Sequence, residues 1–441
     1  MKILKIITVL FALLLSQPAF CTDWTILIFV QAKNNLCKFA AQNLSDMAKI
    51  GSNNNVNILV QWYQPGQNGI WRYKIEKNKI ELDIHLPQNS DGSNSVELVD
   101  SMRWAVNKYP ADNYFLVLWN HGVGILDPVW GGSGRMGLNP FITNNNPKAQ
   151  ITGLTKNFES EFTTPSQMHQ RGILFNELNR TYMNNQELAQ ALKEIKTDVL
   201  KNRKLDILGM DACLMAMVEV GYQVRNYAKY MVASQEVELA NGWNYLSLLE
   251  GLTYGKMNSI SLAQSIVLTY EQYYKNKIQF YTQSAIDLEN IDTVKDGLNQ
   301  VIKDINEFKK YDKMKLQQII KSSRASSVQF SNRNYVDLYS FYSQLHKKID
   351  ATYNQAYLNK IRIQKTRNSI TKAAKDLKES LTLSMKLINN SVVAKTAGKN
   401  LAGAQGLSIY FPYGKIDNSY IKTEFAQDSL WVKFLQETFS R

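Results

Sequence analysis

The sequence predicts an α/β protein built on a mainly parallel sheet with helices on both faces. Short apolar runs rich in β-branched residues alternate with segments of helical period, the pattern of strand–helix–strand units. The run Tyr114–Trp119 is apolar at nearly every position, as in a parallel strand buried on both faces. Residues 291 to about 391 are almost all of helical period and lysine-rich, which predicts a C-terminal helical subdomain.

Composition places the chain among ordinary globular proteins. It has 441 residues, of which 44% are hydrophobic and 20% charged, and its length allows roughly two or three domain-sized units. The net charge is +13, yet no run of five or six basic residues occurs. We interpret this charge as a solvated surface, with weak attraction to anionic partners as the lesser alternative, and predict no nucleic-acid partner.

Residues 1–21 predict a signal peptide. Lys2 and Lys5 precede the apolar stretch Ile6–Leu15, which is too short to span a membrane. The alternative, a lipoprotein signal acylated at Cys21, fits the preceding Pro-Ala-Phe poorly. No second apolar run of membrane length follows. We therefore expect an exported mature chain, periplasmic or secreted, without a transmembrane segment.

The elements of the first half are expected in the following order: strand Trp24–Val30, helix Leu36–Ile50, strand Val56–Tyr63, a hairpin of Trp71–Glu76 with Ile80–Leu86, helix Val96–Tyr109 and strand Tyr114–Trp119. Those of the second half are helix Asn185–Val199, a strand from Leu205, strand Lys229–Ser234, helices Trp243–Tyr254 and Ser261–Tyr274, and strand Phe280–Asp287. A late strand, Gly406–Phe411, is expected to return to the sheet.

A candidate nucleophile, Cys213, lies in the segment Leu205–Glu219, which predicts a buried strand, a sharp turn and a helix from Leu214. The free N–H groups at such a helix start would lower the thiol pKa and favour the thiolate. The alternative is a cysteine that acts only as a small core hydrophobe. We expect Cys37 to be a packing residue and both cysteines to be free thiols.

A candidate proton carrier, His121, directly follows the strand Tyr114–Trp119. Functional groups of open α/β sheets gather outside the carboxyl ends of the strands, where both His121 and Cys213 fall. That placement supports a Cys/His pair for acyl transfer, against the alternative of a structural histidine. The other histidines, His85, His169 and His346, are expected at the surface.

These residues carry a resemblance to a known family. Asn120-His121-Gly122 together with Asp211-Ala212-Cys213-Leu214-Met215 resembles the clostripain family of cysteine peptidases, which have a caspase-like fold. Further blocks match in order, among them Met231–Glu236 and Gly242–Tyr245, from about Trp24 to Pro412. The resemblance implies a caspase-like catalytic domain at residues 22–290, followed by a helical subdomain at 291–441.

The resemblance also implies an activity, that of a cysteine endopeptidase acting on protein or peptide substrates. Cys213 would be the nucleophile, His121 the acid and base, and the N–H groups of Gly122 and Cys213 the oxyanion hole. No third triad member is evident. The sequence shows no zinc spacing, no EF-hand loop and no other required cofactor, so calcium is implied by resemblance only.

Substrate preference is expected to depend on Asp211. By resemblance, its carboxylate lines the pocket for a basic residue before the cut, Arg over Lys, because Arg can pair with a carboxylate through two hydrogen bonds. The alternative is that Asp211 caps the helix from Leu214. One departure weakens a strong basic preference: Leu239–Asn244 has amides where family members often carry acidic residues.

The stretch 127–171 is the longest without a helix or strand period. Its Gly131–Gly134 run lacks the Lys-Ser/Thr of a phosphate-binding loop. By resemblance to clostripain-like and caspase-like enzymes, we expect this linker to be self-processed. Exposed loops are where proteolytic nicking concentrates, and Lys148 and Lys156 lie nearest the middle, so we expect the cut after one of them.

Two other functions remain open from the sequence. One is a catalytically silent caspase-like protein that binds peptides, and the other is an exported α/β protein that binds a small ligand. The intact pair of Cys213 and His121 argues against the first. The second would be favoured if the long loop were an ordered lid and no peptide were cut.

Overall fold

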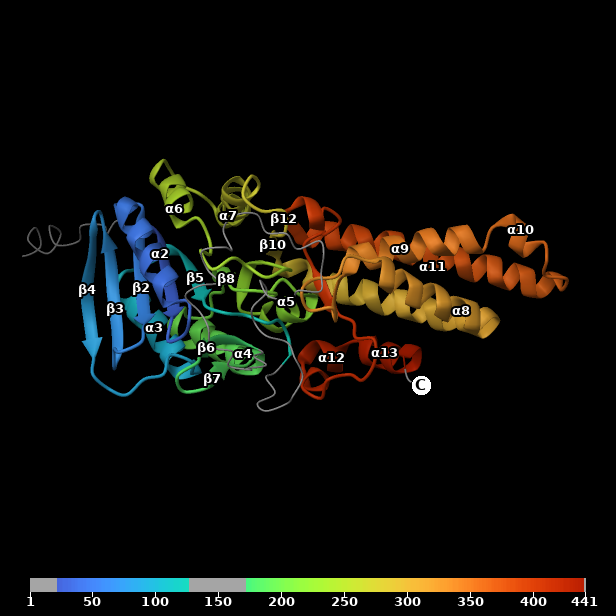
Figure 1. Ribbon diagram of the computed structural model, residues 1–441, viewed down its shortest axis with the longest axis horizontal. Coiled ribbons are helices and arrows are strands. Elements are labelled where there is room, and N and C mark those ends of the chain that lie inside the picture. The colour runs from blue at the N-terminus through green and yellow to red at the C-terminus, as the bar shows by residue number, and fades with distance from the viewer. Residues whose placement is uncertain (1–21, 127–171, 440–441) are drawn as a thin grey trace, which may run out of the picture.

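The computed structural model describes residues 22–126 and 172–439. The molecule is elongated, with a sheet flanked by helices at one end and a bundle of long helices projecting from the other (Figure 1). We call that bundle, residues 291–391, the helical arm. Within the described residues, no helix is long and apolar enough to cross a membrane.

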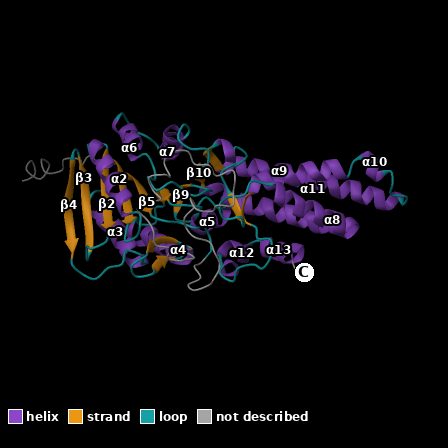
Figure 2. Cartoon of the chain, viewed as in Figure 1, coloured by secondary structure: helices purple, strands orange, loops and turns teal. Residues whose placement is uncertain are grey.

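The sheet has nine strands in the order β12-β10-β9-β8-β5-β1-β2-β3-β4 (Figure 2). Its centre is five parallel strands: β2 (Val56–Tyr63), β1 (Thr22–Gln31), β5 (Ala111–Trp119), β8 (Leu205–Asp211) and β9 (Ala228–Ala233). Antiparallel strands complete both edges: β3 (Ile70–Glu76) and β4 (Lys79–Leu86) on one side, β10 (Thr282–Asp287) and β12 (Val392–Ala397) on the other. The predicted mainly parallel α/β sheet is confirmed.

Helices cover both faces of this sheet, as predicted. Along β5, Leu116 and Leu118 enter one hydrophobic core, whereas Phe115 and Val117 enter the other, because successive side chains of a strand point to opposite faces. The first core is closed by α3 (Ser95–Lys108), α4 (Asn185–Glu194) and α5 (Val218–Val224). The second is closed by α2 (Cys37–Ile50), α6 (Tyr245–Thr253) and α7 (Ser259–Tyr274).

Local sequence signals set several helix starts. The Asn94 side chain accepts the Glu97 N–H at the start of α3. Asn184 and Glu187 form a reciprocal capping box at the start of α4, in which each side chain satisfies a backbone N–H of the other residue. The helix expected over Asn185–Val199 forms, with its last turn as the π-helix η1 (Ile195–Val199).

The helical arm consists of α8 (Ile291–Ser326), α9 (Leu338–Thr352), the short α10 (Gln355–Leu358) and α11 (Gln364–Ser391). At its start Ile291 packs beside Gly221 of α5, and near its end Arg324 donates to the Phe411 carbonyl. Both ends of α8 therefore lie at the base of the arm, and the helix turns back at Asp312, where the backbone leaves helical geometry.

The strand expected to return to the sheet from Gly406–Phe411 does not do so. It forms β13 (Ser408–Tyr410), which pairs with β11 (Tyr335–Asp337) in a separate two-stranded sheet. Buried side chains hold it there, since Glu219 accepts the Tyr410 N–H at 2.8 Å. The late strand that joins the main sheet is β12, directly after α11. The C-terminal helices α12 (Glu424–Asp428) and α13 (Trp431–Phe439) follow β13.

Candidate active site

The strand register brings the two candidate catalytic residues to one edge of the sheet. Trp119 of β5 and Asp211 of β8 are direct partners in the parallel ladder. The Asn120 N–H extends this pairing by donating to the Asp211 carbonyl at 3.3 Å. His121 and Cys213 each lie two residues beyond the Trp119–Asp211 pair. Their predicted placement at the carboxyl ends of neighbouring strands is confirmed.

The His121 ring is held by a residue that was not among the predicted site residues. Its Nε2 lies 2.7 Å from Oδ1 of Asn35, in the turn between β1 and α2. An amide oxygen can only accept, so Nε2 carries the hydrogen and Nδ1 of the neutral ring is the proton acceptor. Burial lowers the pKa of His121 to about 4, which keeps the ring neutral at physiological pH. The sequence signal for Asn35 was its position just after β1, because β1 lies beside β5 in the sheet.

Side-chain amides fix the backbone around this histidine. The Asn120 side chain donates to the carbonyls of Gln31 and Phe175, and the Asn34 side chain donates to Phe175 as well. The Asn120 side-chain oxygen accepts the His121 N–H. These contacts join the carboxyl ends of β1 and β5 to the short strand β6 (Ile173–Asn176), which pairs with β7 (Thr181–Met183). The amides thus hold the His121 backbone in place.

Cys213 lies in a turn and not at a helix start. The helix after β8, α5, begins only at Val218, so the prediction of a helix from Leu214 is wrong. Leu214 has φ +65°, a left-handed conformation that side chains rarely adopt. Its N–H donates to the Glu236 carbonyl at 3.1 Å, and the Ala216 N–H donates to Ser234 at 2.9 Å. Pairing with the segment after β9 therefore replaces the first turns of the expected helix.

The expected low thiol pKa is also wrong for this structure. Burial, together with the neighbouring Glu238 and Glu236 carboxyls, raises the pKa of Cys213 to about 12. Two backbone hydrogen bonds lower this pKa. The Glu238 N–H donates to the Cys213 Sγ at 3.3 Å, and the Gly122 N–H donates to the same sulfur. Cys213 is therefore a neutral thiol in this structure.

Gly122 is required by the close approach of the two strand ends. A Cβ atom there would lie 2.7 Å from the Cys213 carbonyl oxygen and 2.9 Å from the Cβ of Ala212. Real Cβ contacts are not this short, so any side chain would push the His121 and Cys213 backbones apart. The glycine beside the histidine therefore has a packing reason in addition to its predicted role at the oxyanion.

Asp211 is buried beside Cys213 and is held by the segment that follows β9. It accepts hydrogen bonds from the Tyr245 hydroxyl at 2.8 Å and the Trp243 N–H at 3.2 Å. The alternative in which Asp211 caps a helix from Leu214 is wrong, because that helix does not form.

A second buried carboxyl, Glu238, adjoins Asp211 and was missed from the sequence. Burial raises the pKa of both carboxyls, and the Asp211 charge raises that of Glu238 well above its ordinary value. The raised pKa favours the protonated form of Glu238, whose Oε1 accepts a hydrogen bond from Gln283 at 3.0 Å. The only sequence signal was an acidic residue just before the amide-rich Leu239–Asn244 stretch.

The remaining candidates lie elsewhere. Lys148, Lys156 and His169 fall outside the described residues, as does the predicted signal peptide. His85 stacks on Trp71 in the exposed β3–β4 hairpin. Neither Cys37 nor Cys213 is in a disulfide. Across residues 22–126 and 172–439, no three His, Cys, Asp or Glu side chains are grouped so as to hold a metal ion.

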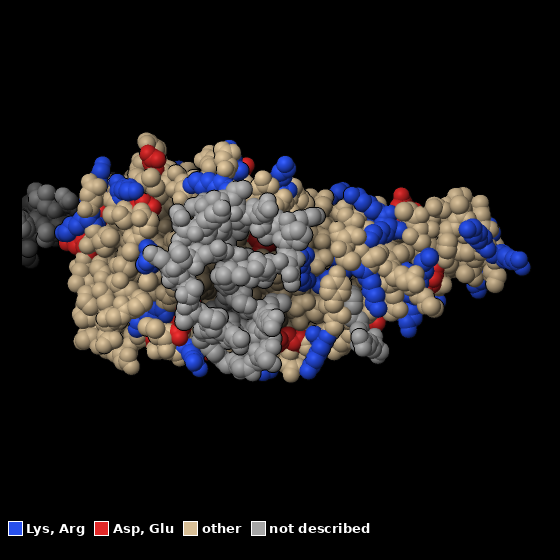
Figure 3. All heavy atoms as spheres, viewed as in Figure 1, with Lys and Arg blue, Asp and Glu red and all other residues tan. Residues whose placement is uncertain are grey.

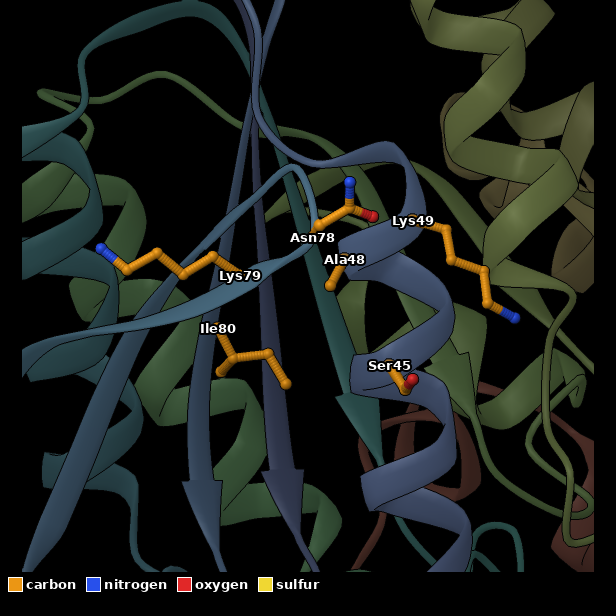
Figure 4. A pocket seen from close by; sticks show the side chains of 6 residues that line it. All are labelled: Ser45, Ala48, Lys49, Asn78, Lys79 and Ile80. Carbon is orange, nitrogen blue, oxygen red and sulfur yellow. The ribbon is translucent and has the colours of Figure 1, made fainter.

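A surface groove elsewhere on the sheet domain is separate from this site. It lies between the C-terminal end of α2 and the β3–β4 turn, where Ser45, Lys49, Asn78 and Ile80 line it (Figure 4). Because α2 starts at the carboxyl end of β1 and runs back along the sheet, its C-terminal end lies at the opposite edge from His121 and Cys213. Neither His121 nor Cys213 lines this groove.

Comparison with known families decides the class of protein. The model of the clostripain family matches residues 28–129 and 156–438. The chain belongs to the clostripain family. As a clostripain-family protein it is a cysteine endopeptidase that acts on protein or peptide substrates. No curated protein sequence is similar enough to be matched to it.

Solved structures of clostripain-family enzymes share this fold. A secreted C11 cysteine protease from Bacteroides thetaiotaomicron, solved with an irreversible peptide inhibitor, is 17% identical with a TM-score of 0.57, over 93% of this chain and 99% of that one. An inactive zymogen of a C11 protease from Parabacteroides distasonis is also 17% identical, with a TM-score of 0.55 over 92% and 98%. These likenesses confirm the caspase-like fold.

Proposed function

We propose that Cys213 and His121 form the catalytic dyad of this peptidase. The observation that carries the proposal is the Trp119–Asp211 register, which sets both residues just beyond adjacent parallel strands. Since the thiol and the imidazole are both neutral, His121 accepts the Sγ proton as the sulfur attacks the scissile carbonyl. The C–N bond then breaks as His121 protonates the leaving amine, and water activated by His121 hydrolyses the thioester.

The N–H groups of Gly122 and Cys213 are the proposed oxyanion hole. The Gly122 N–H donates to the Cys213 sulfur, so it is directed at the reacting centre. Preorganised donors of this kind stabilise the charge that develops on the carbonyl oxygen. The missing Cβ of Gly122 leaves room for this approach.

Substrate preference is proposed to favour a basic residue before the cut, Arg over Lys, through Asp211. The buried carboxylate next to the nucleophile supports this, and the Glu238 carboxyl adjoins it. Tyr245 and Trp243 both donate to Oδ2 of Asp211, so a substrate cation that pairs with both carboxylate oxygens must displace part of this network.

Asp211→Asn is expected to lower kcat/KM for Arg substrates by about 10- to 100-fold, the scale of a lost hydrogen bond to a charged group. Peptides with an uncharged residue before the cut should be affected far less. The measurement is a positional peptide library digested by both proteins, with Glu238→Gln as a matched variant that retains shape. An unchanged Arg preference in Asp211→Asn would show that the pocket assignment is wrong.

Export through residues 1–21 and self-processing within 127–171, after Lys148 or Lys156, are further parts of the proposed function. One similar solved structure is described as an inactive zymogen, which supports a processing step. A cut there would leave the two halves of the site joined, because β5 and β8 pair directly from Phe115–Ile207 to Trp119–Asp211. The proposed thiol and imidazole chemistry uses no metal ion.

Self-processing predicts two fragments from the wild type and an intact chain from Cys213→Ala, purified in parallel and mapped by mass spectrometry. The N-terminal fragment should end at Lys148 or Lys156. Equal nicking of both proteins would reject self-processing and assign the cut to another protease.

A further inference from the structure

The positive charge of this protein is concentrated in the helical arm. Residues 291–391 contain 19 Lys and Arg against 9 Asp and Glu, a net charge of +10 out of +13 for the whole chain. Basic side chains follow the arm along the face shown in Figure 3. The sequence showed no basic run because these residues are spaced along helices and meet only when the helices pack. A surface of this charge attracts anionic partners.

The folding of the arm brings two basic segments together at its outer end. The turn in α8 at Asp312 contacts the end of α9 and α10, since the Tyr353 and Tyr357 hydroxyls donate to the Asp312 carboxylate at 3.2 and 2.6 Å. Residues 313–315 follow this turn, and residues 359–363 follow α10 before α11 begins. We call residues 313–315 with 360–365 the arm tip. It lies at the end of the long axis, away from the sheet (Figure 1).

The cations of the arm tip are not neutralised. Lys313, Lys315, Lys360, Arg362 and Lys365 are all exposed, and in the part of the chain that the structure describes none pairs with a carboxylate. Several lysines elsewhere on the arm are paired: Lys310 with Glu307, Lys372 with Asp376 and Lys378 with Asp350, all at 2.5–2.6 Å. The tip thus gathers five uncompensated cations in two short segments.

Two large apolar side chains lie among these cations. Met314, between Lys313 and Lys315, is 76% exposed, and Ile363, directly after Arg362, is 66% exposed. Apolar side chains that insert at the headgroup boundary, surrounded by Lys and Arg, are the combination that binds an anionic membrane surface. A nucleic acid or an acidic polysaccharide would use the cations but would give Met314 and Ile363 no partner.

We propose that the arm tip is a docking site for an anionic lipid bilayer, with Met314 and Ile363 inserted and the five cations at the headgroups. The 28 residues of α11 span about 42 Å. Docking through the tip would hold the Cys213 edge of the sheet away from the lipid, where it stays open to protein substrates.

Co-sedimentation of the full chain with vesicles tests this proposal. Phosphatidylcholine vesicles with and without phosphatidylglycerol are compared, and binding to the anionic vesicles alone is expected, weakening as salt rises. Replacing all five tip cations with Gln should lower the partition coefficient by at least about 100-fold, since each cation at the surface contributes about fivefold. The double variant Met314→Ser/Ile363→Ser should also weaken binding, although the charge is unchanged.

A matched control removes the same charge elsewhere. It carries Gln at five exposed lysines of the sheet domain, Lys77, Lys79, Lys193, Lys201 and Lys275, and it should bind like the wild type. Equal loss in both five-site variants would overturn the tip assignment, as would no binding to anionic vesicles. A third outcome is that the protein binds heparin or RNA but not vesicles, and that Met314→Ser/Ile363→Ser leaves this binding unchanged. The partner of the tip would then be a soluble polyanion and not a membrane. Far-ultraviolet circular dichroism of each variant confirms that it is folded.

Discussion

Replacing Cys213 with Ala is expected to abolish peptide cleavage, by at least about four orders of magnitude, while the protein stays folded. Loss of the nucleophile removes the covalent route altogether, and what remains is substrate binding and the oxyanion donors. The change deletes one sulfur atom from a turn held mainly by backbone hydrogen bonds, so only a small loss of stability should accompany it. Turnover of a peptide with Arg before the cut measures the first effect, and thermal unfolding the second.

The other cysteine of the described chain provides the control. Cys37 is the first residue of α2 and is also a partly buried thiol. Cys37→Ala should retain full turnover, and an electrophilic peptide should label the wild type and Cys37→Ala but not Cys213→Ala. Cleavage retained by Cys213→Ala would remove this residue from the mechanism.

The raised pKa of Cys213 predicts how the reactivity of its thiol depends on pH. With a pKa of about 12, the thiolate fraction of the uncomplexed enzyme grows about tenfold per pH unit between pH 7 and 10. Alkylation by iodoacetamide without substrate should follow this rise. A rate that is already flat above pH 6 would mean that Cys213 is a preformed thiolate.

Replacing His121 with Ala is expected to lower kcat by about two to four orders of magnitude, the usual scale for a lost acid–base group. The thiol is neutral and needs a base to become a nucleophile, and the leaving amine needs an acid. KM should change less, because the ring takes part in proton transfer more than in binding. Steady-state kinetics measure kcat and KM separately. The control variant His85→Ala, in the exposed hairpin, should leave both unchanged.

Asn35 extends this test to ring orientation. Asn35→Ala removes the 2.7 Å hydrogen bond to Nε2 and leaves the ring itself intact. We expect a smaller loss of kcat than in His121→Ala and a changed pH dependence, since the amide fixes which nitrogen accepts the proton. Wild-type kinetics in Asn35→Ala would mean that the ring is oriented by other contacts.

Local sequence pattern predicted the strands, most helix positions and the location of the candidate site. Buried parallel strands need continuous apolar runs, as at Tyr114–Trp119, and chemistry gathers where such strands end. His121 and Cys213 could therefore be chosen from four histidines and three cysteines without coordinates. Each of these inferences depends only on neighbours along the chain.

Only the tertiary structure decided the state of those residues, because that depends on groups distant in sequence. Burial and the Glu238 carboxyl raise the pKa of the thiol, and the Gly122 N–H lowers it. The imidazole is oriented by Asn35, 86 positions away. The helix expected at Leu214 begins at Val218, since backbone pairing with Ser234 and Glu236 replaces its first turns. The charge at the arm tip likewise arises where Asp312 meets Tyr357, a contact between helices that local pattern does not encode.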